Sequence, residues 1–301
     1  MMSLINALPG AVAQGLIWGI MAIGVYLTFR ILDIADLTVD GSLGTGGAVC
    51  IMLMLSGQNV WVAMAGATAA GMAAGLATGL LHTFMGIPAI LAGILTQLGL
   101  YSINLKTMGK ANQAINVDKY DLLVSLRFIR KVPFYKNTIL IVAIAIILLI
   151  VVLYWFFGTE LGCSLRATGC NDKMARAQGI NTDFNRVLGL MISNGLVALS
   201  GAMLCQYQGF ADINMGRGAI VIGLAAVIIG EAIFGKMFRN FGFKLLAVAL
   251  GSIIYYLVLQ VVIWLGIDTD LLKLLSAGVV AVFLAIPTWK SRYFSNMGKR
   301  G

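Results

Sequence analysis

The sequence predicts an all-α protein, a polytopic bundle of about eight or nine membrane-spanning helices that forms one domain over residues 1–301. Three observations lead to this fold class. Hydrophobic residues make up 60% of the chain and charged residues only 11%, whereas a soluble domain carries about 25% charged residues. The apolar stretches are continuous and reach the roughly 20 residues that a spanning helix needs. They lack the two-residue alternation of a membrane β-barrel.

The apolar stretches follow one another along the whole chain. They lie at 9–29, 41–57, 60–82, 87–105, 138–158, 186–207, 217–234, 243–266 and 271–288. The stretch 217–234 is short for a bilayer, so it is either a full span or a re-entrant half-span, and the count is nine or eight. The first stretch has no basic segment before it and no cleavage site after it, which predicts a retained span.

Basic connections predict the orientation of the bundle. The tail contains Lys290, Arg292, Lys299 and Arg300 without an acid, and the connection near Lys236 is also purely basic. Both are therefore expected in the cytoplasm, with the N-terminus outside and the segment 159–185 inside. By the same count the basic connection 106–137 lies on the external side of the membrane. It departs from the rule that basic connections lie in the cytoplasm. The basic residues that give the net charge of +9 lie mostly between apolar stretches, where they anchor helices at the membrane surface. No nucleic-acid partner is therefore predicted.

Glycines on the third stretch indicate a close helix contact. Gly71, Gly75 and Gly79 are spaced four residues apart, so they lie on one helix face and let a neighbouring backbone approach. The expected use is packing within the chain, and a dimerisation seam is the alternative.

A short internal echo suggests an inverted repeat. The segment from Ile34 to Gly41 is similar to the segment from Phe210 to Gly216, and the predicted topology puts them on opposite sides of the membrane. Inverted repeats of this kind are typical of transporters, whose binding sites lie at the repeat interface.

Polar residues in the first break between spans are candidates for a functional site. Acids inside membrane segments cost about 2.5–3.5 kcal/mol on insertion scales, so they face a cavity or a partner. Asp36, Thr38, Asp40 and Ser42 share this break and are expected beside a translocation path or its gate. The echo segment adds two candidates, which are Asp212 and Asn214. The alternative is that Asp40 or Ser42 only caps the following helix.

One further acid, Glu231, lies near the end of the stretch 217–234, with Lys236 one or two turns later. It is expected to be a structural charge paired along the helix.

The sequence predicts no catalytic residue, no metal site and no cofactor held by this chain. The four cysteines form no CxxC pair, and His82 has no His or Cys at metal-ligand spacing. Gly230 to Lys236 has the spacing of a phosphate-binding P-loop, but Met237 stands where a Ser or Thr would hold magnesium. Its flanks are membrane helices, so no ATPase activity is expected.

The segment 161–181 predicts a short helix between two spans. After an initial turn, Asn171 is a suitable N-cap, Asp172 stands in the first helical turn, and Gly179 ends the helix. A helix over 171–178 is too short to be stable alone and needs a partner. Met174, Ala175 and Ala177 would provide apolar contacts, and Lys173 and Arg176 a charged rim. The alternative is a helix that lies at the membrane surface.

This segment resembles the coupling segment of membrane permeases in ATP-binding-cassette (ABC) importers of the branched-chain amino acid and ribose type. The resemblance rests on Arg166-Ala and on Asn171-Asp-Lys-Met-Ala-Arg-Ala-Gln-Gly-Ile-Asn181, and it continues through 19–24, 195–201 and 223–235. The stretches 36–42 and 101–112 are most similar to the group of tryptophan/tyrosine or uncharacterised permeases.

The resemblance implies a single ABC permease domain in the bacterial cytoplasmic membrane that carries a small solute. The expected solute is an amino acid, and the finer expectation is an aromatic one. It implies a second permease copy, a cytosolic ABC ATPase that holds ATP and magnesium, and an extracellular substrate-binding protein. It assigns coupling to the ATPase to Arg166, Asn171, Asp172, Lys173, Met174, Ala175, Arg176 and Gly179. An ion-coupled secondary transporter that uses Asp36 and Asp40 is the alternative, and a channel comes third because no filter repeat is present.

Overall fold

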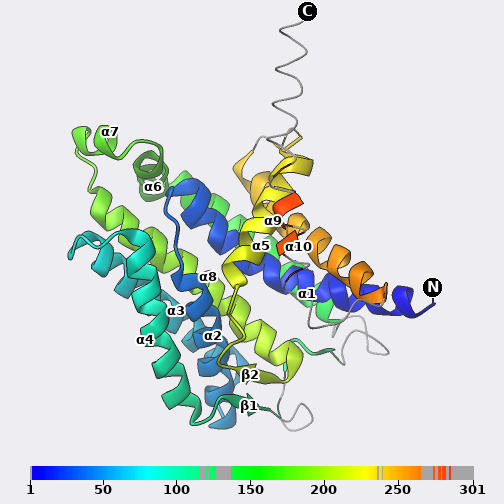
Figure 1. Cartoon of the computed structure of the whole chain (residues 1–301). Helices are drawn as coiled ribbons and strands as arrows, with labels where there is room; N and C mark the ends of the chain where they lie inside the picture. The colour runs from blue at the N-terminus through cyan, green and yellow to red at the C-terminus, as the bar shows by residue number, and fades with distance from the viewer. Residues whose placement is uncertain are drawn as a thin grey trace, which may run out of the picture.

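The computed structural model describes residues 2–115, 120, 122–126, 137–235, 237–238 and 240–265, with isolated positions at 274, 277–278, 280–282 and 285. Nearly all of this part is helical (Figure 1), which confirms the all-α prediction. The elements in chain order are α1 (Met2–Tyr26), the π-helix η1 (Leu27–Ile31), α2 (Thr38–Leu55), α3 (Val60–Thr83), α4 (Ala89–Met108), β1 (Asn112–Ala114), α5 (Thr138–Gly158), α6 (Glu160–Cys170), α7 (Asp172–Ala177), α8 (Thr182–Gln208), β2 (Phe210–Asp212), α9 (Ala219–Phe234) and α10 (Phe241–Trp264).

Seven helices in the described ranges are long and apolar enough to cross a membrane. The seventh predicted stretch, 217–234, corresponds to the shorter helix α9 of 16 residues. The ninth, 271–288, and the basic tail lie outside the described residues except for isolated positions. α8 begins at Thr182 rather than at residue 186 because Asn181 caps it, with its side chain accepting a hydrogen bond from the Phe184 amide at 3.1 Å.

The glycine face of α3 packs against α8. A side chain at Gly71 would collide with the carbonyl oxygen of Asn194, and one at Gly75 with the carbonyl oxygen of Leu190. At Gly79 it would lie 2.9 Å from the Cα atom of Val187. The glycines therefore serve packing within the chain, as the sequence predicted, and this face is not free to form a dimerisation seam.

The two ends of the bundle differ in structure. α6 and α7 lie together towards the top of Figure 1, and β1 and β2 lie at the opposite end. The strands pair antiparallel, with Asn112 opposite Asp212. This separation agrees with the predicted placement of 159–185 and 106–137 on opposite sides, whereas the orientation in the membrane stays a prediction.

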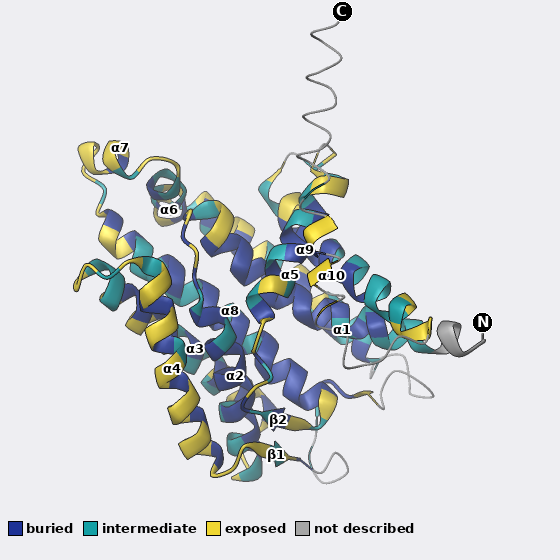
Figure 2. Cartoon of the chain, in the orientation of Figure 1, coloured by how far each residue is buried: buried dark blue, intermediate teal, exposed yellow. Residues whose placement is uncertain are grey.

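Burial separates central from peripheral helices. α1 is the most buried of the seven candidate spans, and α5 has the highest mean hydropathy and the lowest burial. A helix with such an apolar exposed surface is suited to face lipid. Figure 2 shows a stripe of exposed residues along α4, while α2 is largely buried.

Candidate functional site

A buried polar network joins the break before α2 to α8. One Asp36 carboxylate oxygen accepts a hydrogen bond from the Thr38 amide at 2.9 Å, and the other accepts from the Asn194 side chain at 2.7 Å. The Ser42 hydroxyl donates to the Asn194 carbonyl oxygen at 2.6 Å. Asn194 therefore bridges two of the sequence-predicted residues, and each of these three side chains has a hydrogen-bond partner.

A chain of threonine hydroxyls continues this network into α3 and α4. The Thr38 and Thr78 hydroxyl oxygens lie 2.7 Å apart, and Thr78 donates to Thr96 at 2.9 Å. All three residues are buried. Asp36, Thr38 and Ser42 thus lie inside the bundle, where they fix the positions of α2, α3, α4 and α8.

Asp40 does not cap α2, the helix that follows it, which was the alternative role predicted from the sequence. Its carboxylate accepts hydrogen bonds from the backbone amides of Gly218 and Ile220, both at 2.9 Å. Asp40 therefore caps α9, a helix distant in sequence, and not α2. Its negative charge suits the positive end of the α9 dipole. Ser42 does not cap α2, because its hydroxyl donates to Asn194. The side chain that accepts a hydrogen bond from the first turn of α2 is Asp36.

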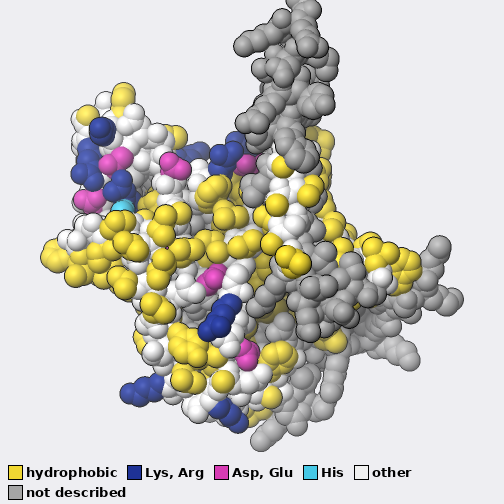
Figure 3. All heavy atoms as spheres, viewed as in Figure 1, with side chains coloured by type: hydrophobic (Ala, Val, Ile, Leu, Met, Phe, Trp, Pro, Cys, Tyr) yellow, Lys and Arg dark blue, Asp and Glu magenta, His cyan; other side chains and the backbone are white. Residues whose placement is uncertain are grey.

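Beside Asp40 a polar cleft of about 360 Å³ opens between α2, α4 and the β2–α9 connection. It is lined by Asp40, Gly41, Gln97, Leu98, Tyr101, Asn104, Ile213 and Arg217. The Arg217 guanidinium lies 6.0 Å from the centre of the Tyr101 ring, at the outer limit of a cation–π contact. Figure 3 shows a few acidic and basic side chains among mostly hydrophobic ones over the middle of the molecule. An acid, a base, two amides and an aromatic ring together can contact a zwitterionic solute.

Four polar side chains of the cleft were not predicted from the sequence. Gln97, Tyr101 and Asn104 follow one another at intervals of four and three residues, which places them on one face of α4 within an apolar stretch. That spacing was the available signal. Arg217 had no comparable signal, because it stands in a connection among other polar residues.

Asp212 and Asn214 do not line the cleft. The Asp212 carboxylate accepts a hydrogen bond from the Asn214 amide at 2.7 Å and so shapes the turn after β2. Their neighbour Ile213 reaches the cleft instead. The two echo segments nevertheless meet, since a side chain at Gly216 would collide with the carbonyl oxygen of Asp40. The inverted repeat itself stays a prediction.

The segment before α8 forms two helices. The predicted short helix is present as α7, with the Asn171 side chain accepting from the Met174 amide at 3.1 Å and Gly179 at φ +80°. The predicted turn before it is wrong, because residues 160–170 form α6. Thr159 caps this helix through the Gly162 amide at 3.4 Å, and this capping side chain makes a helical start favourable.

The exposed face of α7 is narrower than expected. Ala175 is only 4% exposed, so it packs within the chain and is not the docking residue that the sequence suggested. Arg176 donates to the Thr182 hydroxyl at 2.7 Å and to Asp183 at 2.9 Å. Lys173 is exposed, and Met174 is 62% exposed, so the free surface of α7 centres on Met174.

Two further charges tie the ends of helices together. The Arg166 guanidinium donates to the Phe157 carbonyl oxygen and lies 5.9 Å from the centre of the Phe241 ring, which links α6 to α5 and α10. Asp172 forms an ion pair with Arg186 at 3.2 Å and thereby links α7 to α8.

Glu231 is a satisfied structural charge, as the sequence predicted. Its carboxylate accepts two hydrogen bonds from Arg30 in η1, at 2.9 and 3.0 Å. Lys236 lies outside the described residues. The P-loop-like stretch that begins at Gly230 is helical through Phe234, so this part of it forms no loop around a phosphate.

Comparisons with known proteins match nearly the whole chain. Residues 8–290 match the family described as branched-chain amino acid transport system / permease component. The chain is 37% identical over 283 residues to the tyrosine transport system permease protein of Clostridioides difficile, which covers 93% of this chain and 91% of that protein. It is 29% identical over 214 residues to the autoinducer 2 import system permease protein LsrC of Yersinia pestis, which covers 70% of this chain and 58% of that protein.

A solved structure shares the fold. PsaBC from Streptococcus pneumoniae, determined in complex with a Fab, covers 94% of this chain and 95% of its own, with a TM-score of 0.53. The two sequences are 15% identical, so this likeness concerns the fold alone.

Proposed function

Because the chain belongs to the family of branched-chain amino acid transport system permease components, we propose that it is the membrane-spanning subunit of an ABC importer for an amino acid. The family match over residues 8–290 carries this proposal. The polar cleft beside α4 and the exposed turn at Met174 support it, because an importer subunit needs both a path and a contact for its ATPase.

The cleft is the proposed translocation path. Asp40, Tyr101 and Arg217 line it. Asp36, Thr38 and Ser42 are buried and hydrogen-bond the surrounding helices to one another. Asp212 and Asn214 shape the turn that carries Ile213 to the cleft. One face of α4 is exposed in the single chain. A second copy of the permease packed against this face would close the cleft into a central path.

The proposed coupling contact is the exposed face of α7. Met174 is a flexible apolar side chain that adapts to a groove, and Lys173 is the charged group beside it. Asn171, Asp172, Arg176 and Gly179 shape and anchor the helix, and Arg166 braces α6 behind it. ATP and magnesium would bind to the partner ATPase, and this chain would contribute no catalytic group, metal ligand or cofactor.

The proposed substrate is an aromatic amino acid delivered by an extracellular binding protein. The name of the relative from C. difficile, a tyrosine transport system permease protein, supports this choice. Tyr101 and Arg217 support it as well, because an aromatic ring and a guanidinium can contact an aromatic side chain and a carboxylate.

Reconstitution tests the proposal. The permease, its ATPase and its binding protein are placed in proteoliposomes, and uptake of labelled tyrosine is measured with and without ATP and vanadate. Uptake should require ATP, and Arg217→Ala should lower it by about tenfold or more through loss of a charged contact. Lys110→Ala, an exposed basic residue outside the cleft, is the matched control.

Other outcomes decide between alternatives. Uptake driven by an ion gradient without ATP would identify a secondary transporter. Equal uptake by the Arg217→Ala and Lys110→Ala variants would remove the cleft from the path. Tight binding of a sugar and of no amino acid to the binding protein would change the substrate and leave the importer in place.

A further inference from the structure

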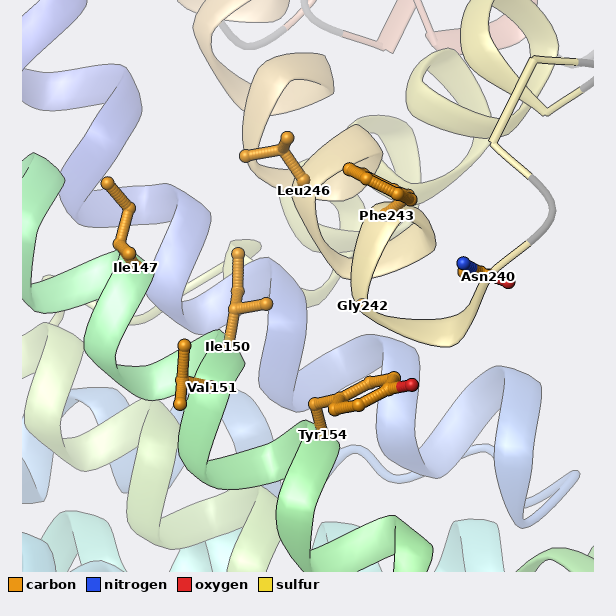
Figure 4. A pocket seen from close by; sticks show the side chains of 8 residues that line it. All are labelled: Ile147, Ile150, Val151, Tyr154, Asn240, Gly242, Phe243 and Leu246. Carbon is orange, nitrogen blue, oxygen red and sulfur yellow. The ribbon is translucent and has the colours of Figure 1, made fainter.

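Two hollows of similar volume differ in how far their polar side chains are buried. The hollow between α5 and the start of α10 measures about 390 Å³ and is lined mostly by apolar side chains (Figure 4). Its two polar side chains, Tyr154 and Asn240, are both exposed. The polar cleft of about 360 Å³ contains a polar side chain of another kind, because Asn104 lines it and is only 2% exposed.

Asn104 occupies a position of α4 that packing alone would fill with an apolar residue. It belongs to the buried stripe of this helix, four residues from Leu100 and four from Met108. Thr96, the other polar residue of this stripe, is hydrogen-bonded to Thr78. Among the residues that the structure describes, the Asn104 carboxamide has no hydrogen-bond partner. A buried amide without a partner is costly, which indicates that a ligand in the cleft supplies the missing bond.

The carboxamide lies about one helical turn from the charged part of the cleft. Its Nδ2 atom is 3.5 Å from the position that a side chain would take at Gly44 on α2. Asp40 precedes Gly44 by four residues, which is about 6 Å along the helix. The Asp40 carboxylate accepts a hydrogen bond from the amide of Gly218, the residue after Arg217, so the backbone of Arg217 lies beside the acid. The cleft therefore has charged groups near Asp40 and a neutral amide farther along α2.

This arrangement matches the polar groups of tyrosine. Arg217 and Asp40 suit a carboxylate and an ammonium group, because charge-assisted hydrogen bonds are stronger than neutral ones. The Asn104 carboxamide both donates and accepts hydrogen bonds, as a hydroxyl does. In tyrosine the phenol ring holds the hydroxyl at a comparable distance from the charged groups, and Tyr101 offers an aromatic ring for contact with it.

We propose that Asn104 selects tyrosine over phenylalanine by hydrogen-bonding the phenol hydroxyl. Phenylalanine in the same position would leave the carboxamide without a partner, and a site built to bond a hydroxyl rejects the analogue that lacks it. This inference rests on the proposed function, because it places an aromatic amino acid in the cleft. The permease would then add its own selectivity to that of the binding protein.

Two buried asparagines test whether Asn104 serves recognition or packing. Asn194 is also buried, and its side chain is hydrogen-bonded to Asp36 and Ser42. Asn194→Leu should therefore lower the unfolding temperature of the full chain in nanodiscs. Asn104→Leu breaks no hydrogen bond within the described chain and should leave the unfolding temperature unchanged or raise it. Equal losses of stability in the two variants would overturn the proposal, because Asn104 would then be a structural residue.

Competition binding measures the preference itself. Labelled tyrosine is bound to the permease and its ATPase in nanodiscs, without the binding protein, and is displaced by unlabelled tyrosine or phenylalanine. The wild type should prefer tyrosine by about tenfold, the effect of a hydrogen bond whose loss leaves a buried group unpaired. Asn104→Leu should remove this preference by weakening the binding of tyrosine, whereas Arg217→Ala should weaken the binding of both amino acids.

The outcomes separate this inference from the proposed function. Equal affinity of the wild type for tyrosine and phenylalanine, or an unchanged preference in Asn104→Leu, would overturn the role of Asn104 and leave the importer in place. Binding of neither amino acid by the wild type would contradict the cleft as an amino-acid site, and the inference would fail together with the proposed path.

Discussion

The polar network around Asp36 and the polar contacts of α7 use the same chemical groups with different consequences. Asp36, Ser42 and Asn194 are buried and hydrogen-bonded, and a buried polar group that loses its partner costs about 1–3 kcal/mol. The Arg176–Asp183 pair is half-exposed, with both side chains 52% accessible, and such pairs contribute about 0–1 kcal/mol. The first region is therefore fixed, and the second can be displaced by a partner.

This difference assigns separate tasks to the two regions. The fixed network holds α2, α3, α4 and α8 around the cleft, so the lining residues keep their positions. α7 is held to α8 by partly exposed ion pairs of Asp172 and Arg176 and by its caps, so under the proposed function a bound ATPase would displace it more easily than it would the buried network.

The largest effect is expected at the α3–α8 contact. Gly75→Leu places a side chain against the carbonyl oxygen of Leu190 and should destabilise the fold by about 3 kcal/mol or more through overpacking. Gly99 on α4 has no neighbouring atom within 4 Å of a new side chain, so Gly99→Leu should change stability by less than about 0.5 kcal/mol. Thermal unfolding in detergent measures both. Equal losses would mean that α3 and α8 are not packed as described.

An intermediate effect is expected in the buried network. Asp36→Asn turns an amide donor towards the Asn194 donor, and the mismatch should cost about 1–3 kcal/mol. Adding Asn194→Asp restores one donor and one acceptor, so the double variant should recover part of the loss. A double-mutant cycle of unfolding free energies measures this coupling. Additive losses would place the two residues out of contact.

The smallest effect on stability, and a large one on coupling, is expected at α7. Met174→Glu lies on the surface and should change stability by less than about 0.5 kcal/mol, yet it should weaken ATPase binding or uncouple hydrolysis from transport. Thr107→Glu, exposed at the other end of the bundle, is the control. Ala175→Glu is a poorer probe, because Ala175 is buried and a charge there would disturb α7 itself.

Normal ATPase association and normal transport by the Met174→Glu variant would exclude this face of α7 as the coupling contact. Co-purification of the ATPase with the permease, followed by coupled transport in proteoliposomes, measures both quantities.

Apolar runs predicted most of the fold, because a bilayer imposes helix length and continuity on the sequence. Helix starts were predicted less well at α2 and α8, where a polar residue such as Asn181 extends the helix beyond the apolar run. The prediction of α7 succeeded because the cap at Asn171 and the glycine stop are local signals.

The candidate site was predicted only in part, because its contacts are between distant segments. Asp40 was predicted to lie beside the path or, as the alternative, to cap the following helix, and its contact with α9 follows only from the tertiary structure. The partner of Glu231 is Arg30, which lies 201 residues away, so the nearby Lys236 was the only partner visible in the sequence. Ala175 shares its type with exposed Ala177, and neither residue alone shows which side of α7 meets the bundle.

The glycine at residue 169 has a mechanical consequence. A side chain there would collide with the carbonyl oxygen of Ile31, so α6 rests directly on the backbone of η1, with no flexible side chain to absorb a displacement. Arg30 in η1 is in turn joined to Glu231 on α9 by two hydrogen bonds. α6 therefore cannot shift towards η1 without moving the η1 backbone, and η1 is joined through Arg30 to α9, whose first amides are held by Asp40.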